Sequence, residues 1–290
     1  MAENIDKLNE QLFRVLADNK TPVDVRLKKV KYLIRLGADK NAKNTQGVPA
    51  VEVAVNNGDI GIVEFFCKCG ANIEAGGLNH VGCLVRAIER NNVEMVEVLI
   101  KEGANIYIKD YTGWTPIIWA SYRGREEVLK LLIKTGADVN AVSLLGESAL
   151  MRASGKGNEN VANMLLENGA DVNMVDKNGF TALMWAARHC GDIPARIAKK
   201  LIDNGALVNK KDNEGETALM WAARYNSVAV IKVLLKNGAD VNIKNNYGDR
   251  VWDGCDREIV KVIKEHIKKT SGEPYNDGGF WGKIFGGFGR

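Results

Sequence analysis

The stretch Gly136-Ala137-Asp138-Val139-Asn140 decides the fold of this 290-residue chain, because its Gly-Ala pair returns at a fixed interval. Successive pairs are separated by 33, 33, 33, 33, 36 and 33 residues. A period of this size is typical of a solenoid, in which each unit is too small to bury its own apolar face and stacks on its neighbours. The pairs begin at Gly37, Gly70, Gly103, Gly136, Gly169, Gly205 and Gly238.

Each unit also carries the pattern of two helices. A hairpin glycine, such as Gly146 or Gly179, precedes a serine- or threonine-led turn that can cap the first helix. Seven residues after the glycine stands a small alanine, which lets neighbouring first helices approach closely. Apolar residues eight, seven, four and three places ahead of each Gly-Ala pair predict a second, amphipathic helix. The glycine of that pair then ends the helix in a left-handed conformation.

With these residues the chain resembles the ankyrin repeat family. The resemblance rests on three segments in one register: Gly-x-Thr-Pro/Ala-Leu, as in Gly179–Leu183, the apolar second helix, and Gly-Ala-Asp-Val-Asn. It covers roughly residues 44–268. It implies an all-α ankyrin-repeat solenoid of stacked helix pairs joined by projecting hairpin loops, with a binding function rather than a catalytic one.

We predict four parts along the chain: an N-terminal capping helix pair (1–43), six ankyrin repeats (44–244), a C-terminal capping repeat (245–269) and a flexible tail rich in glycine and aromatic residues (270–290). The N-terminal cap shows a helical stripe of Ile5, Leu8, Leu12, Val15 and Leu16.

His80 stands where a hairpin glycine is expected. Extra residues near 190–196 explain the 36-residue step, and we expect them between the two helices of their unit, as a tolerated loop or a partner contact.

Composition and motifs argue against several classes of function. The formal net charge of +4 is too small to indicate nucleic acid or an anionic membrane by itself. Five cysteines, an odd number, indicate reduced thiols in the cytoplasm, with delivery into a host cell as an effector as the alternative. Cys67 and Cys69 lie two apart in a predicted helix, which favours packing over metal binding. We find no catalytic motif, metal-ligand pattern or cofactor fingerprint, and Gly155-Lys156-Gly157 is interpreted as a turn between helices.

The family resemblance places binding residues beside the hairpin glycines and at the ends of the first helices. Tyrosine, tryptophan and arginine dominate binding hot spots, so these places supply an interaction surface. The cluster Tyr111, Trp114, Tyr122 and Arg123 is the first choice for an anchor, with edge packing as the alternative. The full candidate set is Tyr111, Trp114, Tyr122, Arg123, Lys156, Phe180, Arg188, Arg224 and Tyr225.

A basic residue recurs once per unit along the same face, which favours a protein or an acidic peptide as the partner. Nucleic acid is the rival use of such a stripe, and glutamates that interrupt the stripe make it unlikely. Trp119, Trp185 and Trp221 share one place on the first helix, and we interpret them as packing residues that form a ladder between repeats. The basic residues are Arg90, Arg123, Lys156, Arg188 and Arg224, and the glutamates are Glu89, Glu147 and Glu216.

The tail carries large aromatic side chains, which suggest a second docking element. Its glycines each oppose a helix by about 1 kcal/mol. The tail could dock onto a partner, a membrane or the protein's own groove. We therefore expect a non-enzymatic protein-binding scaffold, with a membrane-tethered scaffold or a nucleic-acid-binding protein as alternatives. The sequence specifies neither the partner nor an oligomeric state. The aromatic tail residues are Phe280, Trp281, Phe285 and Phe288.

Overall fold

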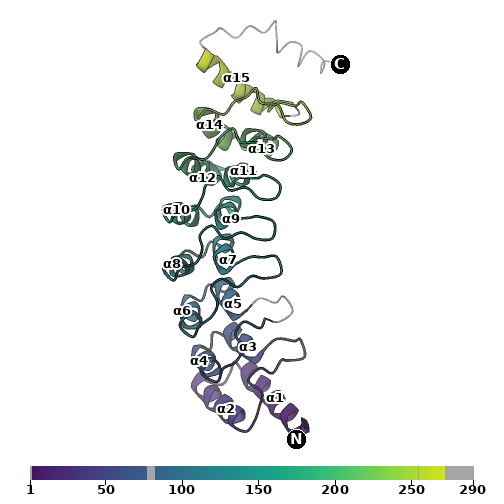
Figure 1. The fold of residues 1–290 in the computed structure, drawn as a ribbon, viewed down its shortest axis with the longest axis vertical. Helices are drawn as coiled ribbons and strands as arrows, with labels where there is room; N and C mark the ends of the chain where they lie inside the picture. The colour runs from purple at the N-terminus through teal and green to yellow at the C-terminus, as the bar shows by residue number, and fades with distance from the viewer. Residues whose placement is uncertain (1, 77–81, 254, 272–290) are drawn as a thin grey trace.

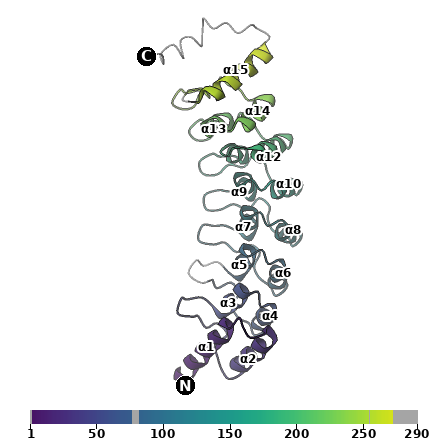
Figure 2. The same ribbon diagram turned by 180° about the vertical axis from the view of Figure 1, so that it is seen from behind.

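The computed structural model describes residues 2–76, 82–253 and 255–271. These residues form 15 helices and no extended strand, and the helices stack in pairs into a long column (Figure 1). Long loops project from one side of the column, as the view from behind also shows (Figure 2). His80 and the aromatic tail residues Phe280, Trp281, Phe285 and Phe288 lie outside the described residues.

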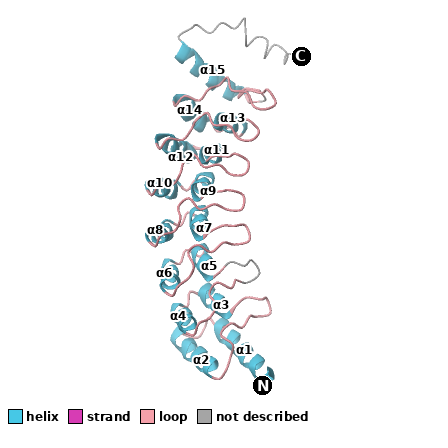
Figure 3. Ribbon diagram, viewed as in Figure 1, coloured by secondary structure: helices cyan, strands magenta, loops and turns pink. Residues whose placement is uncertain are grey.

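The two helices of each unit form two parallel rows. The first row faces the projecting loops, and the second row lines the opposite side (Figure 3). The first row contains α3 (Ala50–Asn57), α5 (Cys83–Glu89), α7 (Pro116–Arg123), α9 (Ala149–Lys156), α11 (Ala182–Ala187) and α13 (Ala218–Arg224). The second row contains α4 (Ile60–Lys68), α6 (Val93–Lys101), α8 (Glu126–Lys134), α10 (Glu159–Glu167), α12 (Asp192–Asp203) and α14 (Val228–Lys236). The ends are α1 (Ala2–Ala17), α2 (Val23–Arg35) and α15 (Arg257–Ser271).

Three first-row helices begin at the N-cap residues that the sequence predicts. The hydroxyls of Ser148, Thr181 and Thr217 accept hydrogen bonds from backbone N–H groups three residues on, at 3.3, 3.3 and 3.4 Å. Thr115 departs from this pattern, because its hydroxyl has no partner among the described residues. Pro116 begins that helix instead, since its fixed φ suits the first helical position.

The apolar pattern becomes one continuous core. Side chains of the second row, such as Val128, Leu129 and Leu132, are fully buried. In the N-terminal cap, Leu8, Leu12 and Leu16 are buried as expected, whereas Ile5 at the free end is 41% exposed. The recurring small residues of the first row are all completely buried between neighbouring helices: Ala54, Ala87, Ala120, Ala153, Ala186 and Ala222.

The Gly-Ala-Asp-Val-Asn stretch ties each unit to the next. Gly136 has a φ of 93°, which favours glycine after a helix. The Asn140 side chain donates to the carbonyl of Gly169 at 3.2 Å and accepts from the N–H of Asp171 at 2.8 Å. Asn173 and Asn209 repeat both bonds to the following unit. Each repeat unit therefore contributes hydrogen bonds to the next unit as well as a helix pair.

One irregular segment differs from its prediction, and another agrees with it. The sequence predicts the extra residues near 190–196 between the two helices of their unit, but the structure places the insertion within α12, which has 12 residues where α10 and α14 have 9. Asp192 and Pro194 suit the first turn of a helix, so the insertion lengthens α12 by about one turn instead of forming a longer loop. Gly155 and Lys156 end α9, and Gly157 follows with a φ of 74°, so this segment is the expected turn. Helix α15 reaches Ser271, two residues beyond the boundary placed at 269, a shift that is common at helix ends.

Candidate functional site

Half-buried tryptophans mark the surface made by α7, α9, α11, α13 and the adjoining hairpins, which we call the first-row face. The indole N–H groups of Trp119, Trp185 and Trp221 donate to aspartates nine residues earlier, at 2.9, 3.2 and 2.7 Å. Each bond joins a first helix to the hairpin of its own unit. These tryptophans therefore pack as expected, but each indole is hydrogen-bonded within its own unit rather than to the next tryptophan.

The unit between Trp119 and Trp185 carries Arg152 at the tryptophan place. The Arg152 guanidinium lies 4.7 Å from the ring centroid of Trp114 and 4.9 Å from that of Trp185, so it bridges two aromatic groups. It also forms an ion pair with the buried Glu147. Sequence reasoning missed Arg152, although its position six residues after Gly146, equivalent to Trp119 and Trp185, was the available signal.

Three of the four predicted anchor residues belong to one cluster. The rings of Trp114 and Tyr122 lie 5.0 Å apart edge to face, and Trp119 completes the group. The Arg123 guanidinium lies 5.5 Å from the Tyr122 ring. Tyr111, the fourth residue, takes no part in this cluster and is 70% exposed in its hairpin.

A second cluster brings together Phe180, Arg188, Arg224 and Tyr225 around Trp221. The ring centroids of Phe180 and Trp221 are 4.9 Å apart, and those of Trp221 and Tyr225 are 6.1 Å apart. The Arg188 guanidinium lies within 5.7 Å of four rings, including Trp185 at 5.3 Å. The structure thus places every candidate residue except Tyr111 in one of two adjoining aromatic and cationic clusters, with Lys156 4.7 Å from the Tyr122 ring.

The basic ladder does not occupy a single register. Arg90, Arg123 and Lys156 stand ten residues after the hairpin place, whereas Arg188 and Arg224 stand nine residues after it. Cations of both registers lie over rings, Arg123 over Trp119 and Tyr122 and Arg188 over Trp185 and Tyr225. The ladder is therefore a band of cations on the first-row face and not a straight row.

The two clusters enclose a hollow of about 260 Å³, which we call the central hollow. Gly155 lies in its wall and leaves room for the Trp185 ring, because a Cβ there would stand 2.8 Å from a Trp185 ring carbon. A neighbouring hollow of about 370 Å³ continues past His189 to residues 190–194. The central hollow is lined by Tyr122, Arg152, Lys156, Trp185, Arg188 and Tyr225, together with Gly155 and His189.

Positive charge dominates the central hollow. Burial lowers the pKa of His189, and the nearby charges of Arg188 and Lys156 lower it further. None of the described lining residues is acidic. The lowered pKa favours the uncharged imidazole, and the hollow presents arginine and lysine cations against aromatic faces.

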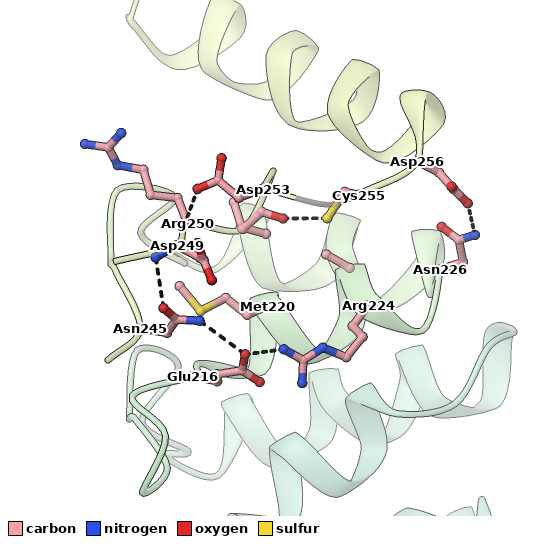
Figure 4. Close-up of a pocket in the computed structure, with 12 residues that line it drawn as sticks. Glu216, Met220, Arg224, Asn226, Asn245, Asp249, Arg250, Asp253, Cys255 and Asp256 are labelled. Carbon is pink, nitrogen blue, oxygen red and sulfur yellow. Dashed lines mark hydrogen bonds and ion pairs between the residues drawn. The ribbon is translucent and has the colours of Figure 1, made fainter. Parts of the chain in front are cut away.

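A smaller hollow of about 160 Å³ lies beside the C-terminal cap (Figure 4). Glu216 accepts from Arg224 and from the Asn245 amide, the latter at 3.4 Å. The second carboxylate oxygen of Glu216 is buried and has no hydrogen-bond donor among the described residues. Glu147, at the equivalent place, differs because Trp114 and Ser143 both donate to its second oxygen.

The repeat geometry agrees with the comparison to protein families. The family model described as ankyrin repeats (3 copies) matches residues 52–143, 84–176 and 150–245. The chain belongs to the ankyrin repeat family. Ankyrin repeats are generally protein–protein interaction modules. No curated protein matches the chain.

Outside the first-row face, the ankyrin repeats offer little reactive chemistry. In the described part of the chain, no group of three histidine, cysteine or acidic side chains is arranged to hold a metal ion. Burial raises the pKa of Cys67 to about 11 and raises that of Cys83 further, so both thiols stay protonated. Across residues 2–76, 82–253 and 255–271, no helix is long and apolar enough to cross a membrane.

Proposed function

We propose that this ankyrin-repeat protein is a non-enzymatic scaffold that binds a segment of another protein on its first-row face. The observation that carries the proposal is the pair of clusters on α7, α9, α11 and α13. There, Trp119, Trp185 and Trp221 are half-buried and held by hydrogen bonds, and arginines lie over their rings. Aromatic side chains have few rotamers, and arginines that already pack on rings have lost part of their freedom, so both lose less conformational entropy on binding than free surface side chains do.

Among the described residues of the second row, an aromatic ring with a cation over it occurs at Phe65 of α4, where Lys31 lies 5.7 Å from the ring centroid, and no cluster like those of the first-row face is found. Surface residues of the second row form ion pairs within a helix, such as Lys130 with Glu127 at 2.6 Å, and between helices, such as Arg196 with Glu159 at 2.7 Å. Exposed pairs of this kind contribute about 0–1 kcal/mol and carry no aromatic anchor. This contrast favours the first-row face over the second row as the binding surface.

The experiment is affinity capture from a cytosolic extract with matched variants. Arg123→Glu combined with Tyr225→Ala alters exposed parts of both clusters and leaves the tryptophan–aspartate bonds in place. Lys130→Glu combined with Lys199→Glu alters the second row and serves as the control. We expect the first variant to lose proteins that wild type and control both capture. Equal loss in the control variant, or full retention by the first variant, would contradict the proposal.

The C-terminal tail is proposed as a second contact. Removal of residues 272–290 leaves α15 complete, so the deletion tests the tail without cutting the cap. We expect the deleted protein to capture the same partner more weakly. Association of the intact protein with lipid vesicles, lost on deletion, would favour the membrane-tether alternative instead.

A further inference from the structure

The cations of the first-row face differ in whether a carboxylate neutralises them. Arg123 pairs with Glu89 at 2.9 Å, and Arg152 and Arg224 form ion pairs with buried glutamates of the hairpins. By contrast, Lys156 and Arg188 have no acidic partner within ion-pairing distance in the described part of the chain. These two residues line the same hollow.

The guanidinium of Arg188 is held in place without being neutralised. It lies over Trp185 and Tyr225, and it donates to the Tyr225 hydroxyl at 3.4 Å. Aromatic faces fix the position of an arginine while leaving its N–H groups able to bind an anion. A fixed cation loses less entropy when it binds an anion, so the arrangement is preorganised.

The hollow has room beside these cations. A side chain at position 155 would meet Trp185, and glycine avoids that contact. The Lys156 ammonium lies over Tyr122 on one side of the hollow, and Arg188 lies over the second cluster on the other. The hollow of about 260 Å³ is therefore lined by two cations that no carboxylate of the described residues neutralises.

A carboxylate suits this place better than a nucleic-acid backbone. Nucleic acid binds through a regular series of phosphates and through bases stacked on free aromatic faces. Here Arg152, Arg188 and Arg224 already cover those faces. The adjoining hollow beside Phe180 is lined by Glu214 and Glu216, which would repel the next phosphates.

We propose that the central hollow binds a glutamate or aspartate side chain of the partner protein, with the carboxylate between Lys156 and Arg188. This inference rests on the proposed function and adds the chemistry of the partner. The carboxylate would accept charge-assisted hydrogen bonds from both cations, and such bonds are the strong ones. The aromatic rims on either side would contact the residues that flank the acid.

The test uses the full chain and a yeast-displayed library of random twelve-residue peptides. Peptides selected on wild type are then titrated against Lys156→Gln, the double variant Lys156→Gln/Arg188→Gln, and Lys130→Gln as a second-row control. Because Arg188 packs on several rings, thermal melting checks that each variant folds. We expect the selected peptides to be rich in acidic residues and to bind the single variant about tenfold more weakly. The control should bind them like wild type.

Each other outcome overturns the inference in a distinct way. Selected peptides without acidic residues, or peptides that bind the double variant as well as wild type, would remove the carboxylate site and leave the proposed face intact. Failure to select any peptide would count against both the site and the proposed function. Tighter binding of a single-stranded oligothymidine, lost in the double variant, would assign the hollow to phosphate.

Discussion

Gly155 and Trp185 are in a contact that only glycine allows, because a Cβ at position 155 would stand 2.8 Å from Cε3 of the Trp185 ring. The two residues belong to neighbouring first-row helices, and both line the central hollow. The close approach of α9 and α11 and the shape of the hollow therefore depend on the absence of a side chain at position 155.

Gly155→Ala should destabilise the protein, even though alanine is the better helix former. We expect a loss of about 1–3 kcal/mol from overpacking against Trp185. Gly61→Ala is the matched control, since its Cβ would meet Leu27 at an ordinary 3.5 Å and should gain up to about 1 kcal/mol. Urea unfolding of both variants measures the difference. Equal stability changes would show that the contact is not tight.

Glu147 and Glu216 occupy equivalent places but differ in their hydrogen bonds, so Trp114→Phe and Phe180→Trp should have opposite effects on stability. Trp114→Phe removes a donor to the buried Glu147 and should cost about 1 kcal/mol. Phe180 lines the same hollow as Glu216, so Phe180→Trp offers a donor to the unpartnered oxygen and should be neutral or stabilising. Denaturant unfolding checks both. Destabilisation by both exchanges to a similar degree would refute this explanation.

The asparagine that ends the Gly-Ala-Asp-Val-Asn stretch should matter only where another unit follows. Asn173→Ala removes two bonds to the next unit and should cost about 1–2 kcal/mol. In the last such stretch, Asn242 donates its backbone N–H to Asp240, and its side chain bonds to no other described residue, so Asn242→Ala should change stability by less than about 0.5 kcal/mol. Thermal melting compares the two. A larger effect at Asn242 would contradict the inter-unit role.

Binding of an acidic peptide should strengthen as the pH falls from 7.5 to 5.5. Arg152, Lys156 and Arg188 face the hollow that His189 lines, and burial with two of these charges lowers the pKa of His189. A bound carboxylate favours the protonated imidazole, so binding raises that pKa and takes up a proton. Glutamate itself titrates near pH 4.3, below this range. Affinity measured across the range should become flat in His189→Gln, and a wild-type affinity that falls toward pH 5.5 would be the contrary result.

Much of the fold could be predicted from local signals in the sequence. The position of the Gly-Ala pair fixes where second-row helices end, as at Gly136, and Thr181 and Thr217 cap their helices as expected. These features depend on backbone geometry and neighbouring residues, which a repeat displays many times. The register locates the extra residues near 190–196 but not their structure, because spacing alone does not say whether inserted residues lengthen a loop or a helix; here they lengthen α12.

The candidate site could be predicted only in part, because its contacts cross between units. Tyr111 has the residue type of an anchor, but its hairpin position leaves it outside both clusters. Arg152 has the residue type of an ordinary surface cation, yet it lies between the rings of two other units. Such roles depend on which side chains of neighbouring repeats face each other, and the spacing within one repeat does not encode that.

Hydrogen–deuterium exchange of the full chain, with and without the captured partner protein, shows directly which row of helices the partner covers. Amides that a partner covers exchange more slowly, and the two rows of helices give separate peptides. We predict slower exchange in α9, α11 and α13 and in their hairpins, with no change in α8, α10 and α12. Slower exchange confined to the second row would contradict binding on the first-row face.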